Sequence, residues 1–191
     1  MRADICKTLD NIKKNSPRRE VFRNNKNKQW RENWVAAKFC ESLNWVGALV
    51  CTPVKDHGDD VFIKHDNKSY PFQVAEIAPH DPGVVKNLPL SKKDKNGLIS
   101  CEVHGSLAPQ MTTLIKALAQ KKDQKCYANQ ENMNLLIYLN PPGAPIIDTK
   151  EDIDTVALTE QMRSSKFKTI SLYENGTVIF IKGDINSLAQ V

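Results

Sequence analysis

The charged residues of this chain are spread unevenly, and the basic ones gather at its start. Residues 1–31 contain ten lysines or arginines and three acidic residues, a local charge of 10 − 3 = +7, so the rest carries 5 − 7 = −2. Such a segment can bind phosphate groups, because each cation that meets a phosphate releases a counterion. The alternative is a solvated arm that only keeps the protein soluble. The candidate nucleic-acid contacts are Arg18 and Arg19 in this arm and, further along, Lys92, Lys93, Lys116 and Lys125.

The cysteines and histidines of the sequence do not have the spacing of a transition-metal site or of a disulfide framework. The five cysteines are scattered, without a Cys-x-x-Cys pair or a nearby histidine that would complete a zinc site. We therefore expect no disulfide framework. No apolar run approaches the roughly 20 residues of a membrane span, and the start lacks the apolar run of a signal peptide. These features favour a cytoplasmic protein without a membrane partner, and they leave a homodimer open.

A single α/β domain with a basic helical arm is expected to position the functional residues. The 191 residues suffice for one domain with an appendage. We assign the arm to residues 1–28, where Ile5, Leu9 and Ile12 lie at helical spacing, and the domain to residues 29–191. The domain is predicted to be a mixed central β-sheet flanked by helices.

The pattern of apolar residues predicts the order of elements in this domain. An amphipathic helix is expected over residues 29–43, with Glu32 in its first turn, where the helix dipole favours an acid. Asp66-Asn67-Lys68 is a turn sequence, so the strands before and after it should form an antiparallel hairpin. The remaining elements are strands at 46–52, 60–65 and 70–77, a long loop over 78–102, a helix from Ser106, a buried strand in MNLLIYLN, a helix over 152–163 and a final hairpin in KTISLYENGTVIFI.

This order of helix, three strands, helix and buried strand resembles the core of the PD-(D/E)xK (restriction endonuclease-like) nuclease superfamily. RENWVAAKFCESLNWVG resembles the first helix with its glutamate, GDDVFIK the second strand with its leading aspartate, and YPFQVAEI the third strand with the acid-x-lysine element. The segment LIKALAQKKDQKCYANQENMNLLIYLN is similar to the following helix and buried strand. The resemblance covers about residues 29–140, and more loosely continues to residue 181.

The resemblance implies a Mg²⁺- or Mn²⁺-dependent nuclease acting on DNA or RNA. In such enzymes carboxylates hold the metal ion, which polarises the scissile phosphate, and a lysine stabilises the developing charge. It assigns Asp60 as the principal metal ligand, Gln73 in place of the second acid, and Glu76 as a further ligand if the strand bulges. The implied catalytic residues are Glu32, Asp60, Gln73 and a lysine from the following helix, for which we choose Lys121.

The chain departs from the family pattern at two positions. Gln73 replaces the second acid, and Ala75 stands where the lysine belongs. Residues i and i+2 of a strand share a face, so Gln73 and Ala75 should point together and Glu76 should point away. The lysine would then come from Lys116, Lys121 or Lys125. Because of these departures, a binding module that holds nucleic acid or a protein without cutting it remains an alternative.

Overall fold

In the computed structural model, the described residues are 28–53, 58–77, 108–125, 127, 129–139, 153–174 and 176–190. The predicted arm before Lys28 and the predicted long loop lie outside these residues. So do four of the candidate nucleic-acid contacts, Arg18, Arg19, Lys92 and Lys93.

A six-stranded mixed sheet forms the centre of the described structure, with the strands side by side in chain order. Strands β1, β2 and β3 pair antiparallel with one another, β3, β4 and β5 pair parallel, and β6 pairs antiparallel with β5. The bounds are β1 Leu49–Cys51, β2 Val61–His65, β3 Lys68–Ile77, β4 Asn134–Leu139, β5 Thr169–Glu174 and β6 Thr177–Lys182. The prediction of a mixed α/β architecture is confirmed.

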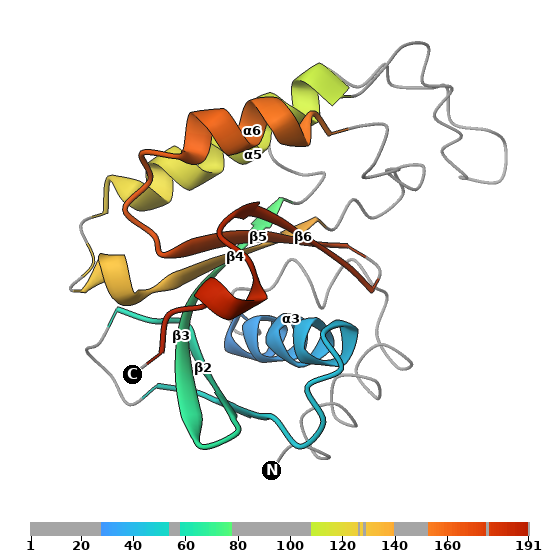
Figure 1. The fold of residues 1–191 in the computed structure, drawn as a ribbon, viewed down its shortest axis with the longest axis vertical. Helices are drawn as coiled ribbons and strands as arrows, with labels where there is room; N and C mark the ends of the chain where they lie inside the picture. Colours follow the sequence, from blue (N-terminus) through green and yellow to red (C-terminus); the bar gives the residue numbers. More distant parts are fainter. Residues whose placement is uncertain are drawn as a thin grey trace, which may run out of the picture.

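Three α-helices of the described structure cover the two faces of this sheet. Helix α3 (Lys28–Ser42) lies on one face, whereas α5 (Ala108–Asp123) and α6 (Thr155–Met162) lie together on the other (Figure 1). Since α5 lies between β3 and β4 in the chain, and α6 between β4 and β5, each helix connects two parallel strands, as parallel pairing requires. Two short 3-10 helices, η2 (Gln130–Asn132) and η3 (Ile185–Ser187), precede β4 and follow β6.

The antiparallel hairpin of β2 and β3 is confirmed, with a turn of two residues, Asp66 and Asn67, rather than the predicted three. The strands are antiparallel, with His65 opposite Lys68. Asp66 and Asn67 have φ values of 49° and 60°, a left-handed conformation that aspartate and asparagine tolerate better than most residues. This turn fixes which residues of the two strands face each other, and so determines the position of Asp60 relative to Gln73.

Two apolar clusters hold the layers together. One lies between the sheet and α5 and α6, and includes Ala75, Ile115 and Leu158; the other lies between the sheet and α3, and includes Phe39 and Val74. All six residues of β4 are buried, as its nearly unbroken apolar sequence predicts. None of the described helices is both long and apolar enough to cross a membrane.

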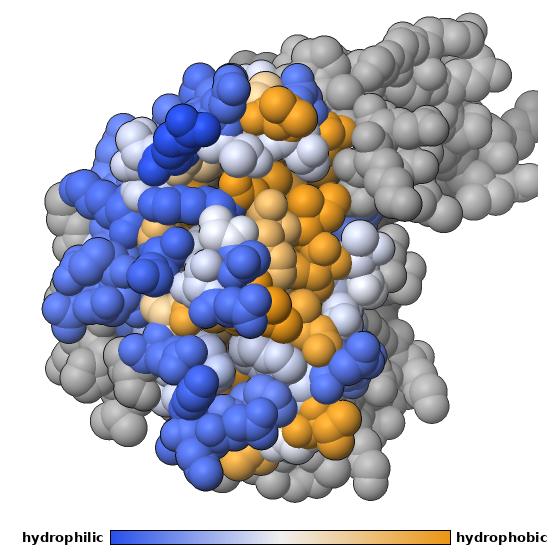
Figure 2. All heavy atoms as spheres, viewed as in Figure 1, coloured by the Kyte–Doolittle hydropathy of each residue, from blue (hydrophilic) through white to orange (hydrophobic). Residues whose placement is uncertain are grey.

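The face of the described structure seen in Figure 2 carries both hydrophilic and hydrophobic areas. Figure 2 shows hydrophobic residues gathered near the middle of one face, beside a broad hydrophilic region. The edge strand β6 is partly apolar, with Val178 and Phe180 only partly buried. A homodimer remains a prediction.

Candidate active site between α3, β3 and α5

Asp60 occupies the centre of the candidate site, one residue before β2. Its backbone N–H donates to the Phe72 carbonyl at 2.9 Å, which extends the pairing of β2 and β3 by one residue and sets Asp60 opposite Gln73. The carboxylate oxygen Oδ2 accepts a hydrogen bond from the Val74 N–H at 2.9 Å. The strand pairing that the turn at Asp66 establishes therefore holds this carboxylate against the backbone of β3.

Three oxygen atoms surround the ammonium group of Lys122, a residue of the last turn of α5. Its Nζ donates to Gln73 Oε1 at 2.7 Å and to the Val74 carbonyl at 3.3 Å, and lies 3.5 Å from Asp60 Oδ2. Only 13% of the Lys122 side chain is exposed. A largely buried cation thus lies among a carboxylate, a side-chain amide and a backbone carbonyl.

Lys28 joins Glu32 to Asp60 on the α3 side. Its Nζ lies 3.0 Å from Glu32 Oε1 and 3.5 Å from Asp60 Oδ1. Lys28 and Glu32 are one helical turn apart, so their side chains lie next to each other. Each oxygen of the Asp60 carboxylate therefore faces a different lysine. Asp60 connects the pair of Lys28 and Glu32 with the pair of Lys122 and Gln73.

Gln73 uses both ends of its amide inside the protein. Its Oε1 accepts from Lys122, while its Nε2 donates to the carbonyl of Gly58. The side chain is almost fully buried, at 2% exposure. Gly58 has a φ of +82°, and a Cβ built there would lie 3.4 Å from Cδ1 of Tyr127, so glycine suits this position. A glutamate at position 73 would have no N–H to donate to Gly58.

The electrostatics of the site follow from partial burial of opposite charges. Burial raises the pKa of Glu32, and the nearby Asp60 carboxylate raises it further against the opposing effect of Lys28. Burial lowers the pKa of Lys122, although the charge of Asp60 works in the other direction. Burial also tends to lower the pKa of Lys28, but its hydrogen bond to Glu32 and the charge of Asp60 outweigh this effect, so the pKa is raised.

A small cavity lies beside the site, between α3 and strands β3 and β4. It has a volume of about 170 Å³, and Lys28, Glu32 and Glu76 are among the residues that line it. Glu76 lies 3.5 Å from Arg31 in an ion pair on this α3 side of the sheet. Gln73 and Ala75 face α5 instead, so the predicted alternation along β3 is confirmed.

The structure brings together three of the predicted residues, Glu32, Asp60 and Gln73, through the two lysines. It does not bring Glu76 to Gln73, because β3 pairs regularly with β4 through Glu76 and Glu76 points to the other face. The expected position of Glu32 in the first turn is wrong. The described helix begins at Lys28, no acidic residue lies in its first turn, and Glu32 is buried against the core at 7% exposure.

The lysine at the site is Lys122, which the sequence analysis did not select. Lys121 and Lys125 are exposed and Lys116 is partly exposed, and none of them has an ion pair or side-chain hydrogen bond among those found in the described structure. A signal was present in the sequence. Lys122 follows Ile115 and Ala119 at offsets of seven and three residues, so it continues the buried stripe of α5.

The acceptor atoms at the site are all oxygens. Among the described residues there is no group of three or more histidine, cysteine, aspartate or glutamate side chains that could hold a metal ion. Two carboxylates, Glu32 and Asp60, are instead accompanied by the amide oxygen of Gln73 and the carbonyl of Val74. All four groups supply oxygen, which Mg²⁺ and Mn²⁺ prefer, and no nitrogen or sulfur ligand is needed.

No protein-family model matches the chain, and no curated protein or solved structure matches it either. The functional argument therefore depends on the residues and geometry of the site.

Proposed function

We propose that the chain is a metal-dependent nuclease-like protein with a restriction endonuclease-like core that acts on DNA or RNA. The order α3, β1, β2, β3, α5 and β4 supports this proposal, because it is the order of that core. A further support is that Lys28 links Glu32 to Asp60 and Lys122 links Gln73 to Asp60.

The observation that carries the proposal is the group of oxygens around Lys122. The Lys122 ammonium is a cation held by Asp60, Gln73 and the Val74 carbonyl at 2.7 to 3.5 Å. A divalent cation needs the same kind of oxygen surroundings. The departure at Ala75 is then compensated from outside the strand, since the amine comes from α5.

In the proposed mechanism, Asp60 and Gln73 would hold the cation and Glu32 would add a second carboxylate. The bound Mg²⁺ or Mn²⁺ would polarise the scissile phosphate and favour formation of hydroxide from water. Lys122 would then place its ammonium against the charge that develops on the phosphate. Lys28 keeps Glu32 and Asp60 close together despite their like charges.

The test is cleavage of single- and double-stranded DNA and RNA with Mg²⁺, with Mn²⁺ and with chelator. We expect cleavage that needs metal and that Asp60→Asn abolishes, because this substitution keeps the size of the side chain and removes its charge. Asp66→Asn is the matched control: Asp66 lies in the exposed turn, and asparagine tolerates its left-handed conformation. Cleavage that persists in chelator, or in Asp60→Asn, would contradict the proposal.

A second candidate is a binding module on the same fold that does not cut nucleic acid. The observation that favours it is that the polar groups of the site already have partners within the protein. Both oxygens of Asp60 face lysines, and both ends of the Gln73 amide are hydrogen-bonded. The same assay decides between the two. Binding of nucleic acid without cleavage under either metal would favour the binding module.

A further inference from the structure

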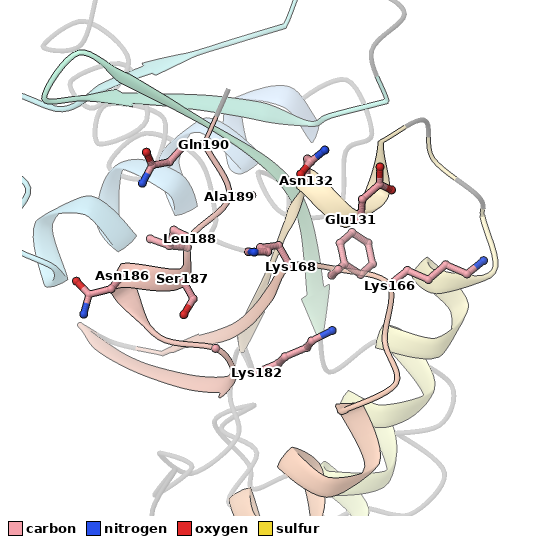
Figure 3. A pocket seen from close by; sticks show the side chains of 12 residues that line it. Glu131, Asn132, Lys166, Lys168, Lys182, Asn186, Ser187, Leu188, Ala189 and Gln190 are labelled. Carbon is pink, nitrogen blue, oxygen red and sulfur yellow. The ribbon is translucent and has the colours of Figure 1, made fainter.

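A second concentration of lysines lines a cleft at the end of the sheet where β4 and β5 begin. We call it the lysine cleft and define it by Lys166, Lys168 and Lys182 together with Asn186 and Ser187 on the opposite side; its volume is about 800 Å³. Figure 3 shows Lys168 directed towards the side of Ser187 and Leu188, whereas Lys182 and Lys166 extend on the other side. The sequence analysis selected none of these residues.

The charge of the lysine cleft favours an anion. Glu131 is the one acidic residue among those that line it, against three lysines, so the lining charge is 3 − 1 = +2. Within the described part of the chain, neither the Lys166 nor the Lys168 ammonium forms a salt bridge, and both side chains are exposed. Lys182 is partly buried and donates to the Ser165 carbonyl.

Two further carboxylates lie close to the cleft, and hydrogen bonds from neutral groups of its walls hold them in place. Asp184 accepts hydrogen bonds from the N–H and hydroxyl of Ser187, at 2.8 and 2.7 Å. Asp123 accepts from the Ser165 hydroxyl at 3.0 Å and from the Lys166 N–H at 3.1 Å. These bonds fix the walls, but both carboxylates keep their charge and offset part of the charge of the lysines. The exposed ammonium groups of Lys166 and Lys168 are therefore the groups that would meet an anion. Burial lowers the pKa of Lys182, an effect to which Lys168 adds and which Asp123 opposes.

The lysine cleft is close to the candidate active site. Through the parallel register, Gln73 is level with Leu135 and Ile170, and Lys168 lies two residues before Ile170. Two strand spacings and two residues along a strand give a separation of roughly 12 Å between the Cα atoms of Gln73 and Lys168. Helix α5 also connects the two places, because Lys122 contacts Gln73 and the next residue, Asp123, binds the loop that carries Lys166.

We propose that the lysine cleft binds the phosphates of a nucleic-acid strand that passes across the end of α5 to the candidate active site. That the ligand is a nucleic-acid strand rests on the proposed function. The place where it binds rests on the lysine cleft alone. An isolated phosphate would occupy only a small part of the 800 Å³, whereas successive phosphates of a strand would meet the lysines in turn.

The experiment compares the double variant Lys166→Gln/Lys168→Gln with Lys64→Gln/Lys68→Gln. The control removes the same charge from two exposed lysines of the β2–β3 hairpin. Binding of labelled single strands is followed by fluorescence anisotropy in chelator, so that no cleavage occurs. If two phosphates are left without a lysine partner, the slope of log K against log salt should become less negative by about 1.4. This change corresponds to roughly 25-fold weaker binding at about 0.1 M salt. Lys166→Arg/Lys168→Arg should keep wild-type affinity.

The outcomes separate this proposal from the proposed function. Weaker binding in the cleft variant alone supports the cleft even if the wild-type protein never cuts nucleic acid. Equal affinity and slope in wild type and cleft variant overturn it even if metal-dependent cleavage is found. An equal loss in the hairpin control also overturns it, because the effect would then be one of total charge. If inorganic phosphate competes as effectively, per phosphate group, as an unlabelled oligonucleotide does, the cleft is a small-anion site. That result would overturn the proposal that it binds a nucleic-acid strand.

Discussion

Replacing Lys122 by methionine tests whether the candidate site is assembled as described. The substitution keeps most of the side-chain volume and removes the three interactions of the ammonium. Gln73 Oε1, in a side chain only 2% exposed, would no longer have its charged donor at 2.7 Å. A hydrogen bond to a charged group contributes about 1.5–3 kcal/mol, and Asp60 would keep Lys28 and the Val74 N–H as partners. We therefore expect the free energy of unfolding to fall by about 2 kcal/mol.

The lowered pKa of Lys122 does not contradict this loss. It compares the charged with the neutral amine, and both forms can donate a hydrogen bond to Gln73, whereas methionine cannot. The depressed pKa has its own consequence. At pH values just below 10.5 the unfolded chain binds more protons at this lysine than the folded protein, so this group makes stability rise with pH there. That contribution should disappear in Lys122→Met.

The measurement is urea unfolding at several pH values, with Lys121→Met as the matched control. Lys121 is the exposed neighbour, so its replacement should change the free energy of unfolding by less than about 0.5 kcal/mol. For a domain of this size, about 2 kcal/mol corresponds to a drop in Tm of roughly 4–8 °C. Equal stability of the two variants would show that the hydrogen bonds of Lys122 are not formed, and the candidate site would have to be abandoned.

Four further changes test other parts of the structure. The pKa of Glu32 is raised on folding, so the wild-type protein loses stability from this group as the pH rises above 4.5, whereas the Glu32→Gln variant does not. The free energy of unfolding of the variant minus that of wild type should therefore increase with pH. Urea unfolding at pH 4 to 7 measures this difference, and a difference independent of pH would refute the prediction. Ala75→Lys places an ammonium in the apolar cluster under α5 and should destabilise the fold by more than about 2 kcal/mol, seen as a lower Tm, with Ala75→Met as the uncharged control. Gln73→Glu should lower Tm without metal, because its carboxylate faces the Gly58 carbonyl, and Mg²⁺ should restore Tm more than in wild type if the site binds metal. Deleting residues 1–27 should weaken nucleic-acid binding and flatten its salt dependence if the arm binds phosphate, and unchanged binding would make it a solubilising segment.

The elements of the fold could be predicted because their signals are local. The turn Asp66-Asn67 marks the hairpin by its conformational tolerance, and the apolar run of β4 marks a strand covered on both faces. The boundaries were less accurate: β3 begins at Lys68 rather than residue 70, and β1 is limited to Leu49–Cys51. Pairing with neighbouring strands sets these limits, and that information is not local.

The lysine of the site could not be chosen by composition alone. Three lysines, Lys121, Lys122 and Lys125, lie near the end of α5, and their chemistry is the same. Only the rotation of the helix separates Lys122, which faces the sheet, from Lys121, which faces solvent. Lys28 was likewise assigned to the arm, although it is the first described residue of α3 and contacts Glu32 and Asp60. A long cationic side chain contributes to a site through its charged end. Helical phase and tertiary packing determine where that end lies.

Under the proposed function, the two departures from the nuclease pattern would have a common structural cause. Ala75 packs in the apolar cluster on the α5 side of the sheet, where a lysine stem would have to displace core side chains. With the amine supplied by Lys122 instead, position 73 meets a cation from α5 on one side and the Gly58 carbonyl on the other. A glutamine satisfies both, since its oxygen accepts and its nitrogen donates, whereas a glutamate can only accept. Under the proposed function, Gln73 and Lys122 would together take the place of an acid and a lysine on one strand, so a change at position 73 should be tested together with a change at Lys122.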